Sequence, residues 1–186
     1  MVTGKVLETP LGWVGFVVGG KGLIRTFLVS EDAGRVEAAV KAYTEHHRAS
    51  GSAPGTASDA VQSTVSMAAS TLVSRVSERM TEYFRGHAVG WEGIPLEVGP
   101  CTTFQRRVLD VTAGIPHGQV RTYGWIAEKA GSPRAARAVG QVMSWNPLPI
   151  VIPCHRVVGA GNSLGGFAGG LELKKRLLDL EGARWG

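Results

Sequence analysis

Three short apolar runs near the start of the chain alternate with glycine-containing turns. The runs cover residues 5–9, 13–18 and 23–29, and they are rich in β-branched and aromatic side chains. The segments between them, 10–12 and 19–22, contain the Gly and Pro residues that are typical of hairpin turns. The pattern therefore predicts β-hairpins at the beginning of the chain.

Apolar residues at helical spacing follow these strands. One helix is predicted behind the start signal at residues 30–32, and a second is expected to stop near Gly86. Small and polar residues from about 49 to 62 predict a flexible surface connection between them. Proline and glycine breakers fill the stretch 91–100, where we place a domain boundary. The apolar helix positions are Val36, Val40 and Tyr43, then Leu72, Val76, Met80, Tyr83 and Phe84.

Beyond the boundary, the pattern predicts short helices joined by tight turns. One is expected over about 103–111 and another over about 122–130. Ser132 before Pro133 is typical of a helix cap with Pro in the first helical position, so a further helix is predicted over 134–143. Two short helices joined by a glycine-containing turn form the helix-turn-helix pattern. The same spacing is equally typical of two core helices with surface arginines.

The last predicted helix follows Gly169-Gly170 and ends with an acidic residue, Glu181. The helix dipole disfavours an acid at a C-terminus, so we expect Glu181 to have a partner elsewhere, with His155 as the candidate. Leucines on one face of this helix are expected to point inward and basic residues outward. The inward set is Leu173, Leu177 and Leu180, and the outward set is Lys174, Lys175 and Arg176.

The chemistry of the chain is concentrated in residues 150–159, where apolar residues flank Pro153, Cys154, His155 and Arg156. Such a run predicts a short buried strand or a packed turn. A thiol beside a histidine and an arginine is in the setting where a thiolate forms. The sequence therefore favours a nucleophilic Cys154 over a buried, inert cysteine.

Two other features near this stretch are less informative. Cys101, the second cysteine, is interpreted as a bystander, and two cysteines without Cys-x-x-Cys spacing make a poor zinc site. The glycine-rich segment 159–166 lacks the Lys-Ser/Thr ending of a phosphate-binding loop. We expect this loop instead to wrap closely around a flat substrate.

Composition and charge set the outer limits of the prediction. The 186 residues suit one domain or two small ones, and no apolar run approaches the ~20 residues of a membrane span. We therefore expect a soluble intracellular protein. Residues 1–100 carry 9 Lys/Arg against 10 Asp/Glu, whereas residues 101–186 carry 11 against 5. A basic half suggests contact with a polyanion, although a solvated basic face has the same composition.

The segment Pro153-Cys154-His155-Arg156-Val157 resembles the active-site motif of the O6-alkylguanine-DNA alkyltransferases, also called methylated-DNA–protein-cysteine methyltransferases. Further segments resemble that family in the same order, so that the resemblance covers about residues 70–186. They are residues 104–108, 118–124, 134–140, 146–150, and 169–171 through 181–182. The resulting fold prediction is mixed α/β (α+β). It has a small N-terminal sheet-and-helix domain, 1–98, and a mainly helical, winged helix-turn-helix-like domain, 99–186.

The resemblance implies binding to duplex DNA through the minor groove by the second helix of the helix-turn-helix. The damaged guanine is then expected to be flipped into a pocket. By match, Arg137 enters the base stack in place of the lost base. Tyr123 is expected to press on the 3′ phosphate side and to hydrogen-bond N3 of the guanine. The small residues Ala135, Ala136 and Gly140 are expected to permit close approach to the groove.

The resemblance also implies the chemistry. Cys154 is expected to attack the alkyl carbon as a thiolate, with His155 acting through a water as base and Glu181 orienting the imidazole. Asn146 is expected to hold the active turn by backbone hydrogen bonds. The expected product is a stable thioether, formed once, with no cofactor and no zinc. Met143, Pro149, Val157, Phe167 and Ala168 are expected to line the pocket, with backbone N–H groups near the last two as donors.

Two departures from the family qualify this expectation. Many members carry Tyr and then a polar residue where this chain has Phe167-Ala168, which affects the pocket preference. The Cys/His zinc cluster of some animal members is absent. A non-reactive branch carries Trp at the position of Cys154, so the cysteine argues against that branch.

The leading prediction is therefore a monomeric, cytoplasmic, nucleoid-associated repair protein acting on O6-alkylguanine and also on O4-alkylthymine in DNA. A damage-binding protein without transfer is the second hypothesis. A Cys/His hydrolase is the third, which the direct adjacency of Cys154 and His155 makes awkward, because neighbours in an extended chain point to opposite faces.

Overall fold

The computed structural model describes residues 2–50 and 59–185. The chain divides into two compact units, Met1–Arg85 with Val89–Val98, and Gly86–Ala88 with Gly99–Gly186. Each unit combines helices with strands, so the predicted mixed α/β class is confirmed. Among the described residues, no helix has both the length and the apolar character needed to cross a membrane.

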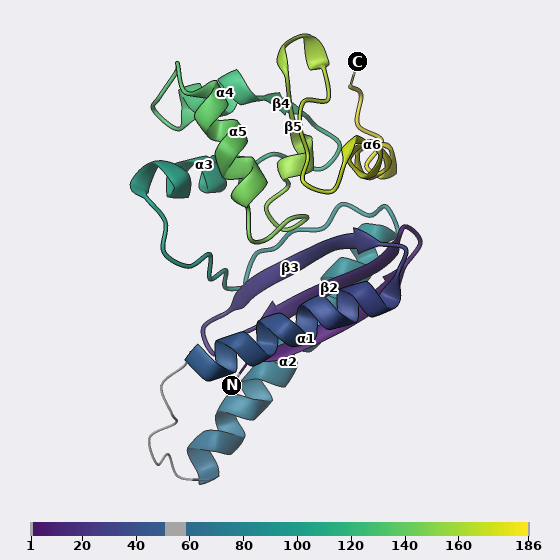
Figure 1. The fold of residues 1–186 in the computed structure, drawn as a ribbon, viewed down its shortest axis with the longest axis vertical. Helices are drawn as coiled ribbons and strands as arrows, with labels where there is room; N and C mark the ends of the chain where they lie inside the picture. Colours follow the sequence, from purple (N-terminus) through teal and green to yellow (C-terminus); the bar gives the residue numbers. More distant parts are fainter. Residues whose placement is uncertain (1, 51–58, 186) are drawn as a thin grey trace. The chain divides into compact units, whose positions relative to one another are not determined.

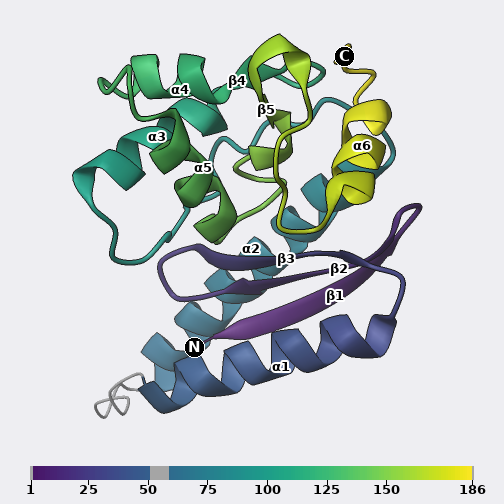
Figure 2. The same cartoon turned by 45° about the horizontal axis from the view of Figure 1, so that its top comes forward.

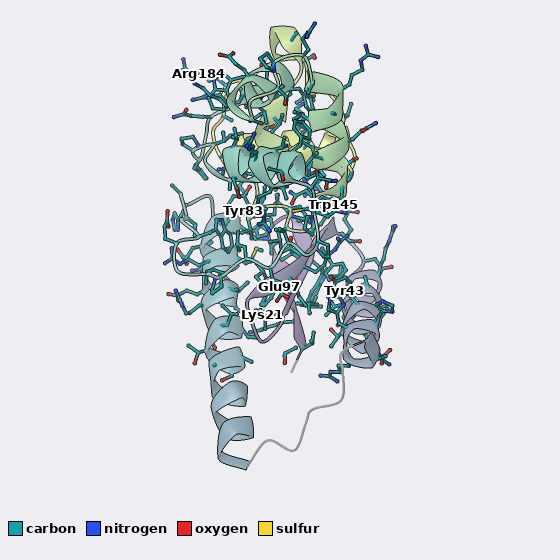
Figure 3. The ribbon with its side chains drawn as sticks, turned by 90° about the vertical axis from the view of Figure 1, so that its left-hand side faces the viewer. Lys21, Tyr43, Tyr83, Glu97, Trp145 and Arg184 are labelled. Atoms are coloured by element: carbon teal, nitrogen blue, oxygen red, sulfur yellow. The ribbon has the colours of Figure 1, made fainter. Side chains whose placement is uncertain are left out.

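The first unit is built on a three-stranded antiparallel sheet in the order β1-β2-β3 (Figure 1). The strands are β1 (Thr3–Thr9), β2 (Gly12–Val18) and β3 (Leu23–Ser30), in agreement with the predicted hairpins. Two helices follow, α1 (Ala33–Ser50) and α2 (Asp59–Phe84). Figure 3 shows Tyr43 of α1 and Tyr83 of α2 on the two sides of the strands.

Helix α1 packs closely on the sheet because a glycine faces it. A side chain at Gly15 would lie 2.5 Å from Val40 and 2.9 Å from Val36. These two valines form a buried cluster with Val17 and Ile24 of the strands. The apolar residues Val36 and Val40, which lie at helical spacing in the sequence, are therefore the residues that α1 buries against the sheet.

The predicted connection at about 49–62 falls mainly on residues 51–58, which lie outside the described residues. Its two ends differ from the prediction, since residues 49–50 belong to α1 and residues 59–62 to α2. Small residues such as Ala are typical of linkers but also have high helix propensity. Composition alone therefore could not locate the ends of these helices.

The second unit contains four helices and a two-stranded parallel sheet (Figure 2). Helix α3 begins after the cap residue Thr102, which exchanges two hydrogen bonds with Gln105. The loop that follows β5 leads through a second short 3-10 turn to α6 (Figure 2). The elements are α3 (Thr103–Ala113), β4 (Arg121–Thr122), α4 (Tyr123–Lys129), α5 (Ala136–Trp145), the 3-10 turn Cys154–Arg156, β5 (Val157–Val158), the 3-10 turn Ala160–Asn162 and α6 (Leu171–Leu180).

The helix-turn-helix is present as α4 and α5, but the second helix begins later than predicted. The N–H of Ala135 donates to the Ser132 carbonyl in a turn, and α5 starts only at Ala136. Ala135 occupies the cap position without a side-chain hydrogen bond. The prediction of Ser132 as the cap is therefore wrong, because the Ser132–Ala135 turn takes up the first two residues assigned to the helix.

Candidate active site

The segment that carries Cys154 is a buried, folded turn. The Asn146 amide donates to the Ile152 carbonyl at 2.8 Å, and its oxygen accepts from the Leu148 N–H at 3.0 Å. Ile150 has a positive φ of 76°, which is unusual for a β-branched residue. Strained backbone of this kind persists only where surrounding contacts hold it. Asn146 supplies such contacts, as the sequence led us to expect.

A short parallel sheet places Tyr123 beside this turn. Strand β4 pairs with β5 through Arg121 opposite Val157 and Thr122 opposite Val158. Tyr123 is the next residue after β4 and the first residue of α4. Thr122 also caps that helix by accepting from the Trp125 N–H. The pairing of β4 with β5 therefore brings the start of the helix-turn-helix next to the residues that follow Cys154.

A cavity of about 620 Å³ opens at Cys154. Cys154 is only 5% exposed, but it is part of the cavity wall. The other wall residues come from α4, α5 and the loop before α6. They are Thr122, Tyr123, Gly124, Ala136, Arg137, Gly140, Met143, Ser144, Ala160, Gly166, Phe167 and Ala168.

The cavity gathers most of the residues predicted for the pocket and the DNA contact. Met143, Phe167 and Ala168 are in its wall. Pro149 and Val157 were also predicted for the pocket, but they are buried and do not line the cavity. Ala136, Arg137 and Gly140 line it from α5, together with Tyr123 of α4. Arg137 is exposed and Ala135 is half-buried just before the helix.

Behind the cysteine, one carboxylate joins three donors. Glu181 Oε1 lies 2.7 Å from His155 Nε2 and accepts from Arg156 Nη2 at 3.0 Å. Its Oε2 accepts from Arg156 Nε at 2.9 Å and from the Gly118 N–H at 3.1 Å. The His155 and Glu181 side chains are fully buried. The partnership predicted for these two residues is therefore present, and Arg156 is an additional member that the sequence reading did not assign.

Burial and charge set the protonation of this group. Burial lowers the pKa of His155, more than Glu181 raises it, so the imidazole is neutral at neutral pH. Burial by itself would raise the pKa of Glu181, but the hydrogen bonds from His155 and Arg156 and the charge of Arg156 outweigh it and hold that pKa well below its usual range. At neutral pH, the site holds an ionised Glu181 and a neutral His155 that is able to accept a proton.

Cys154 differs from the expectation of a preformed thiolate. Burial raises the pKa of its thiol, and the opposing effects of the Asn146 hydrogen bond and the Lys174 charge are smaller. The resting cysteine is therefore a thiol, which would have to lose its proton before it could act as a nucleophile. The sequence placed a histidine and an arginine next to it, but it did not show that packing would exclude water from the sulfur.

Lys174 was predicted to point outward, and this prediction is wrong. The residue is 0% exposed, and its ammonium donates to the carbonyls of Val157 at 2.6 Å and Leu164, with a longer contact of 3.4 Å to Gly166. A signal was available, because Lys174 lies four residues before Leu178 and seven before Glu181. Positions at this spacing share one face of a helix, and both of those residues are buried.

Tyr123 connects the helix-turn-helix to the loop before α6. Its hydroxyl donates to the Gly166 carbonyl at 3.2 Å. Burial and the neighbouring Cys154 raise the pKa of Tyr123, so the phenol keeps its proton at neutral pH. In the described part of the chain, no group of three or more His, Cys, Asp or Glu residues is arranged to hold a metal ion.

The second unit thus joins a helix-turn-helix to a buried cysteine with a His–Glu–Arg network behind it and a cavity in front. Its sequence matches the family model described as 6-O-methylguanine DNA methyltransferase, DNA binding domain, over residues 103–183.

Several known proteins are similar to this chain. A methylated-DNA–protein-cysteine methyltransferase of Methanothermobacter thermautotrophicus is 43% identical over 111 residues, which cover 59% of this chain and 61% of the relative. The crystal structure of an O6-methylguanine methyltransferase of Mycobacterium tuberculosis is 31% identical with a TM-score of 0.67, covering 100% of this chain and 96% of that one. The Mycobacterium tuberculosis OGT in complex with DNA is 29% identical with a TM-score of 0.68, covering 96% and 92%.

These similarities show that the chain belongs to the O6-methylguanine-DNA methyltransferase family. The matched segment spans about three fifths of the length of the Methanothermobacter relative. The family resemblance inferred from the cysteine motif is therefore confirmed.

Proposed function

We propose that this protein repairs alkylated DNA by moving the alkyl group of O6-alkylguanine, and of O4-alkylthymine, to the sulfur of Cys154. The observation that carries the proposal is the position of Cys154. It lies in the wall of a 620 Å³ cavity that is also lined by helix α5 of the helix-turn-helix, with a neutral base beside it. A flipped base held in this cavity meets the sulfur directly.

The reaction starts with removal of the thiol proton. His155 accepts this proton through a water, and the carboxylate of Glu181, 2.7 Å from the other side of the imidazole, stabilises the imidazolium. The thiolate then attacks the alkyl carbon, the sulfur–carbon bond forms, and the bond between that carbon and O6 breaks. The electron pair of the broken bond stays with the guanine.

Guanine leaves as a neutral base because it receives a proton in exchange. Tyr123 lines the cavity and keeps its phenolic proton, so it is the donor that we assign to N3. The phenolate that remains takes back a proton through solvent as the His155 imidazolium releases the one it received from the thiol, so no net proton is gained or lost. Its hydroxyl donates to Gly166 when the cavity is free, and substrate replaces this acceptor. Backbone N–H groups near Phe167 and Ala168, both in the cavity wall, stabilise charge on O6.

DNA binding is assigned to the domain 99–186, acting as a monomer on the minor groove. Arg137 is exposed at the cavity mouth on α5, where it is placed to fill the gap left by a flipped base. On the same helix, Ala136 has only a methyl side chain and Gly140 has none, so the backbone of α5 approaches the groove closely. Flipping costs a few kcal/mol, and these contacts offset that cost.

Each molecule reacts once, because nothing in the site cleaves a thioether. No step requires a cofactor. A free thiol is maintained in a reducing compartment, so we place the protein in the cytoplasm, associated with the nucleoid.

Mass spectrometry tests the proposal. After the protein is mixed with a duplex containing O6-methylguanine, we expect one added methyl group on the peptide that contains Cys154, and none on the Cys101 peptide. A Cys154→Ser variant is the matched control and should remain unmodified while it still binds the duplex. An unmodified wild-type protein, or turnover of many substrate molecules per protein, would contradict the proposal.

A further inference from the structure

Lys174 is the buried cation that the transfer chemistry, as described so far, does not use. It is fully buried in α6, and the three hydrogen-bond contacts of its ammonium all go to main-chain carbonyls. One carbonyl belongs to Val157, three residues after the nucleophile, and two belong to the loop before α6. A buried lysine costs free energy in lost hydration, so a position of this kind calls for a physical reason.

The ammonium connects three parts of the cavity wall. Gly166 accepts from both Lys174 and the Tyr123 hydroxyl, and Gly166 and Tyr123 line the cavity with Cys154. The ammonium also lies 6.0 Å from the centroid of the Tyr123 ring, within the range of a cation–π contact. Lys174 therefore ties the strand after the cysteine and the substrate-facing loop to one point beside the phenol.

The charge of this ammonium is not neutralised by an acid. Among the residues that the structure describes, no carboxylate forms an ion pair with Lys174. The acid in this region, Glu181, is engaged by Arg156 and His155. Carbonyl oxygens solvate the ammonium but leave its unit charge in place. This charge acts on two ionisable groups of the site, because it favours the thiolate of Cys154 and disfavours protonation of His155.

We propose that Lys174 is a positioning residue for alkyl transfer, whose ammonium balances the negative charge that develops on Cys154 and fixes the 164–166 loop in the cavity wall. This inference rests on the proposed function, since it assigns the counter-charge for the thiolate of that reaction. The ionisable groups that interact with the sulfur are Lys174 from α6 and Tyr123 from α4, and His155 and Arg156 follow the cysteine in its own turn. With His155 neutral and Arg156 bound to Glu181, Lys174 is the cation available to the sulfur.

The titration of Lys174 agrees with this role. Burial lowers its pKa to about 8, and Cys154 acts in the opposite direction. The ammonium is thus mostly charged at neutral pH and loses its charge as the pH rises through about 8. An opposite charge within a few ångströms typically shifts a pKa by about 1–3 units, so removal of the ammonium should raise the pKa of the thiol by a measurable amount.

Lys174→Gln separates charge from hydrogen bonding, because the amide still donates but is neutral. The probe is iodoacetamide, with the rate of labelling of the Cys154 peptide measured from pH 6 to 10. We expect labelling of the variant to be about tenfold slower at pH 7, corresponding to a shift of about one pKa unit, and to recover at high pH. Lys174→Arg keeps the charge and should retain most of the rate. The exposed neighbour Lys175→Gln is the matched control and should behave as the wild type.

A purely structural role predicts a different result. If Lys174 only anchored the loop, Lys174→Gln would change the labelling rate by the same factor at every pH. A ratio of wild-type to variant rates that does not change with pH would overturn the inference, because the charge of Lys174 is present at pH 7 and lost above about pH 8. Methyl transfer from the O6-methylguanine duplex is measured in parallel. Absence of transfer in the wild type refutes the proposed function alone, whereas a rate ratio independent of pH refutes the role of Lys174 alone.

A second measurement keeps Lys174 in place and serves if Lys174→Gln does not fold. Cys154→Asp puts a carboxylate at the position of the sulfur that is ionised over the pH range of the lysine titration, and Cys154→Asn is its neutral isostere. Electrostatic coupling is reciprocal, so ¹⁵N NMR of the lysine ammonium groups should show a higher pKa for Lys174 in the Asp variant, by about one unit or more. Lys175 should titrate identically in both variants. Equal Lys174 values in the two variants would overturn the inference.

Discussion

At the scale of single residues, the site depends on how one carboxylate is shared. Glu181 accepts from Arg156 through both oxygens, and in addition from His155 and the Gly118 N–H. The bidentate arginine keeps the acid ionised despite its burial. The same carboxylate then holds the imidazole as a neutral base with a fixed orientation. Stability and reactivity at Cys154 are therefore coupled through Glu181.

Glu181→Gln should destabilise the protein in a pH-dependent way. The pKa of Glu181 is held below its unfolded value, so its contribution to stability is present above the ordinary carboxylate range of about 4 and is lost as the pH falls further. At pH 7, the loss should be about 3–5 kcal/mol, because Arg156 remains buried without its anion. Urea unfolding at pH 7 and at pH 3 measures both values. A loss of the same size at both pH values would contradict the assignment.

Asn146→Ala removes the two hydrogen bonds that hold the turn before Cys154. The buried partners on Leu148 and Ile152 are left unsatisfied, so we expect a loss of about 2 kcal/mol in the free energy of unfolding. Methyl transfer should also slow, because the Asn146 hydrogen bond to the Cys154 thiol favours the thiolate. Ser144→Ala, at an exposed position near the end of helix α5, should cost less than about 0.5 kcal/mol. Equal stability losses in the two variants would argue against the turn-holding role.

At the scale of elements, the loop between β5 and α6 is shaped by its glycines. Gly161 and Gly165 both have a positive φ, of 65° and 62°. They differ in their surroundings, because a side chain at Gly165 would lie 2.8 Å from the Tyr123 ring, whereas nothing lies within 4 Å of one at Gly161. The loop can therefore approach Tyr123 only with glycine at position 165.

The two glycines make a matched pair for a test of this contact. Gly161→Ala and Gly165→Ala should each lose about 1 kcal/mol of stability from the left-handed backbone. Only Gly165→Ala displaces Tyr123, so only this variant should slow methyl transfer, by about tenfold or more if the phenol contributes as a general acid. Single-turnover rates and thermal melts give the two readouts. Similar transfer rates for the two variants would show that Tyr123 does not contribute to methyl transfer.

Helix α5 provides a second test at this scale. Arg137 is in the cavity wall. Arg134 lies before the helix, is exposed, and is not among the residues that line the cavity. Arg137→Ala should reduce repair of duplex DNA much more than reaction with free O6-benzylguanine, because only the duplex requires a base to be extruded. Arg134→Ala should weaken duplex binding modestly without this difference. Equal losses on both substrates in Arg137→Ala would remove the assignment of Arg137 to the base stack.

At the scale of the whole molecule, the excess of basic residues is concentrated in the second half of the chain. Residues 101–186 carry 11 Lys/Arg against 5 Asp/Glu, and residues 1–100 are close to neutral. Part of the basic excess is internal, since Arg156 and Lys174 are buried. The surface cations that remain are the ones available to phosphates. The net charge of residues 101–186 therefore overstates the number of cations that are available to contact phosphates.

This division predicts the salt dependence of DNA binding. With about four phosphate contacts, the logarithm of the affinity should fall with the logarithm of salt concentration with a slope of about −3.6. Fluorescence anisotropy with an unmodified duplex between 50 and 200 mM salt measures the slope. Reaction with free O6-benzylguanine is the control and should be nearly independent of salt. A slope close to zero would contradict binding through the basic half.

The sequence by itself determined the local elements and the identity of the reactive group. Runs of β-branched and aromatic residues between glycine-containing turns predicted the three strands. Apolar spacing predicted the buried faces of α1 and α2, and the motif at Cys154 indicated the family. These features are local, because each depends on residues that are close together in the chain. The late start of α5 was missed because a turn competes with a helix over only a few residues.

Tertiary structure alone decided the state of the charged groups. Lys174 was expected in water and lies inside, and Cys154 was expected as a thiolate and rests as a thiol. Burial of both depends on packing between the turn at 154–158, the loop at 164–166 and α6, which are separate in sequence. A side chain's exposure, and therefore its pKa, follows from which distant segments cover it. Only the folded chain shows that packing.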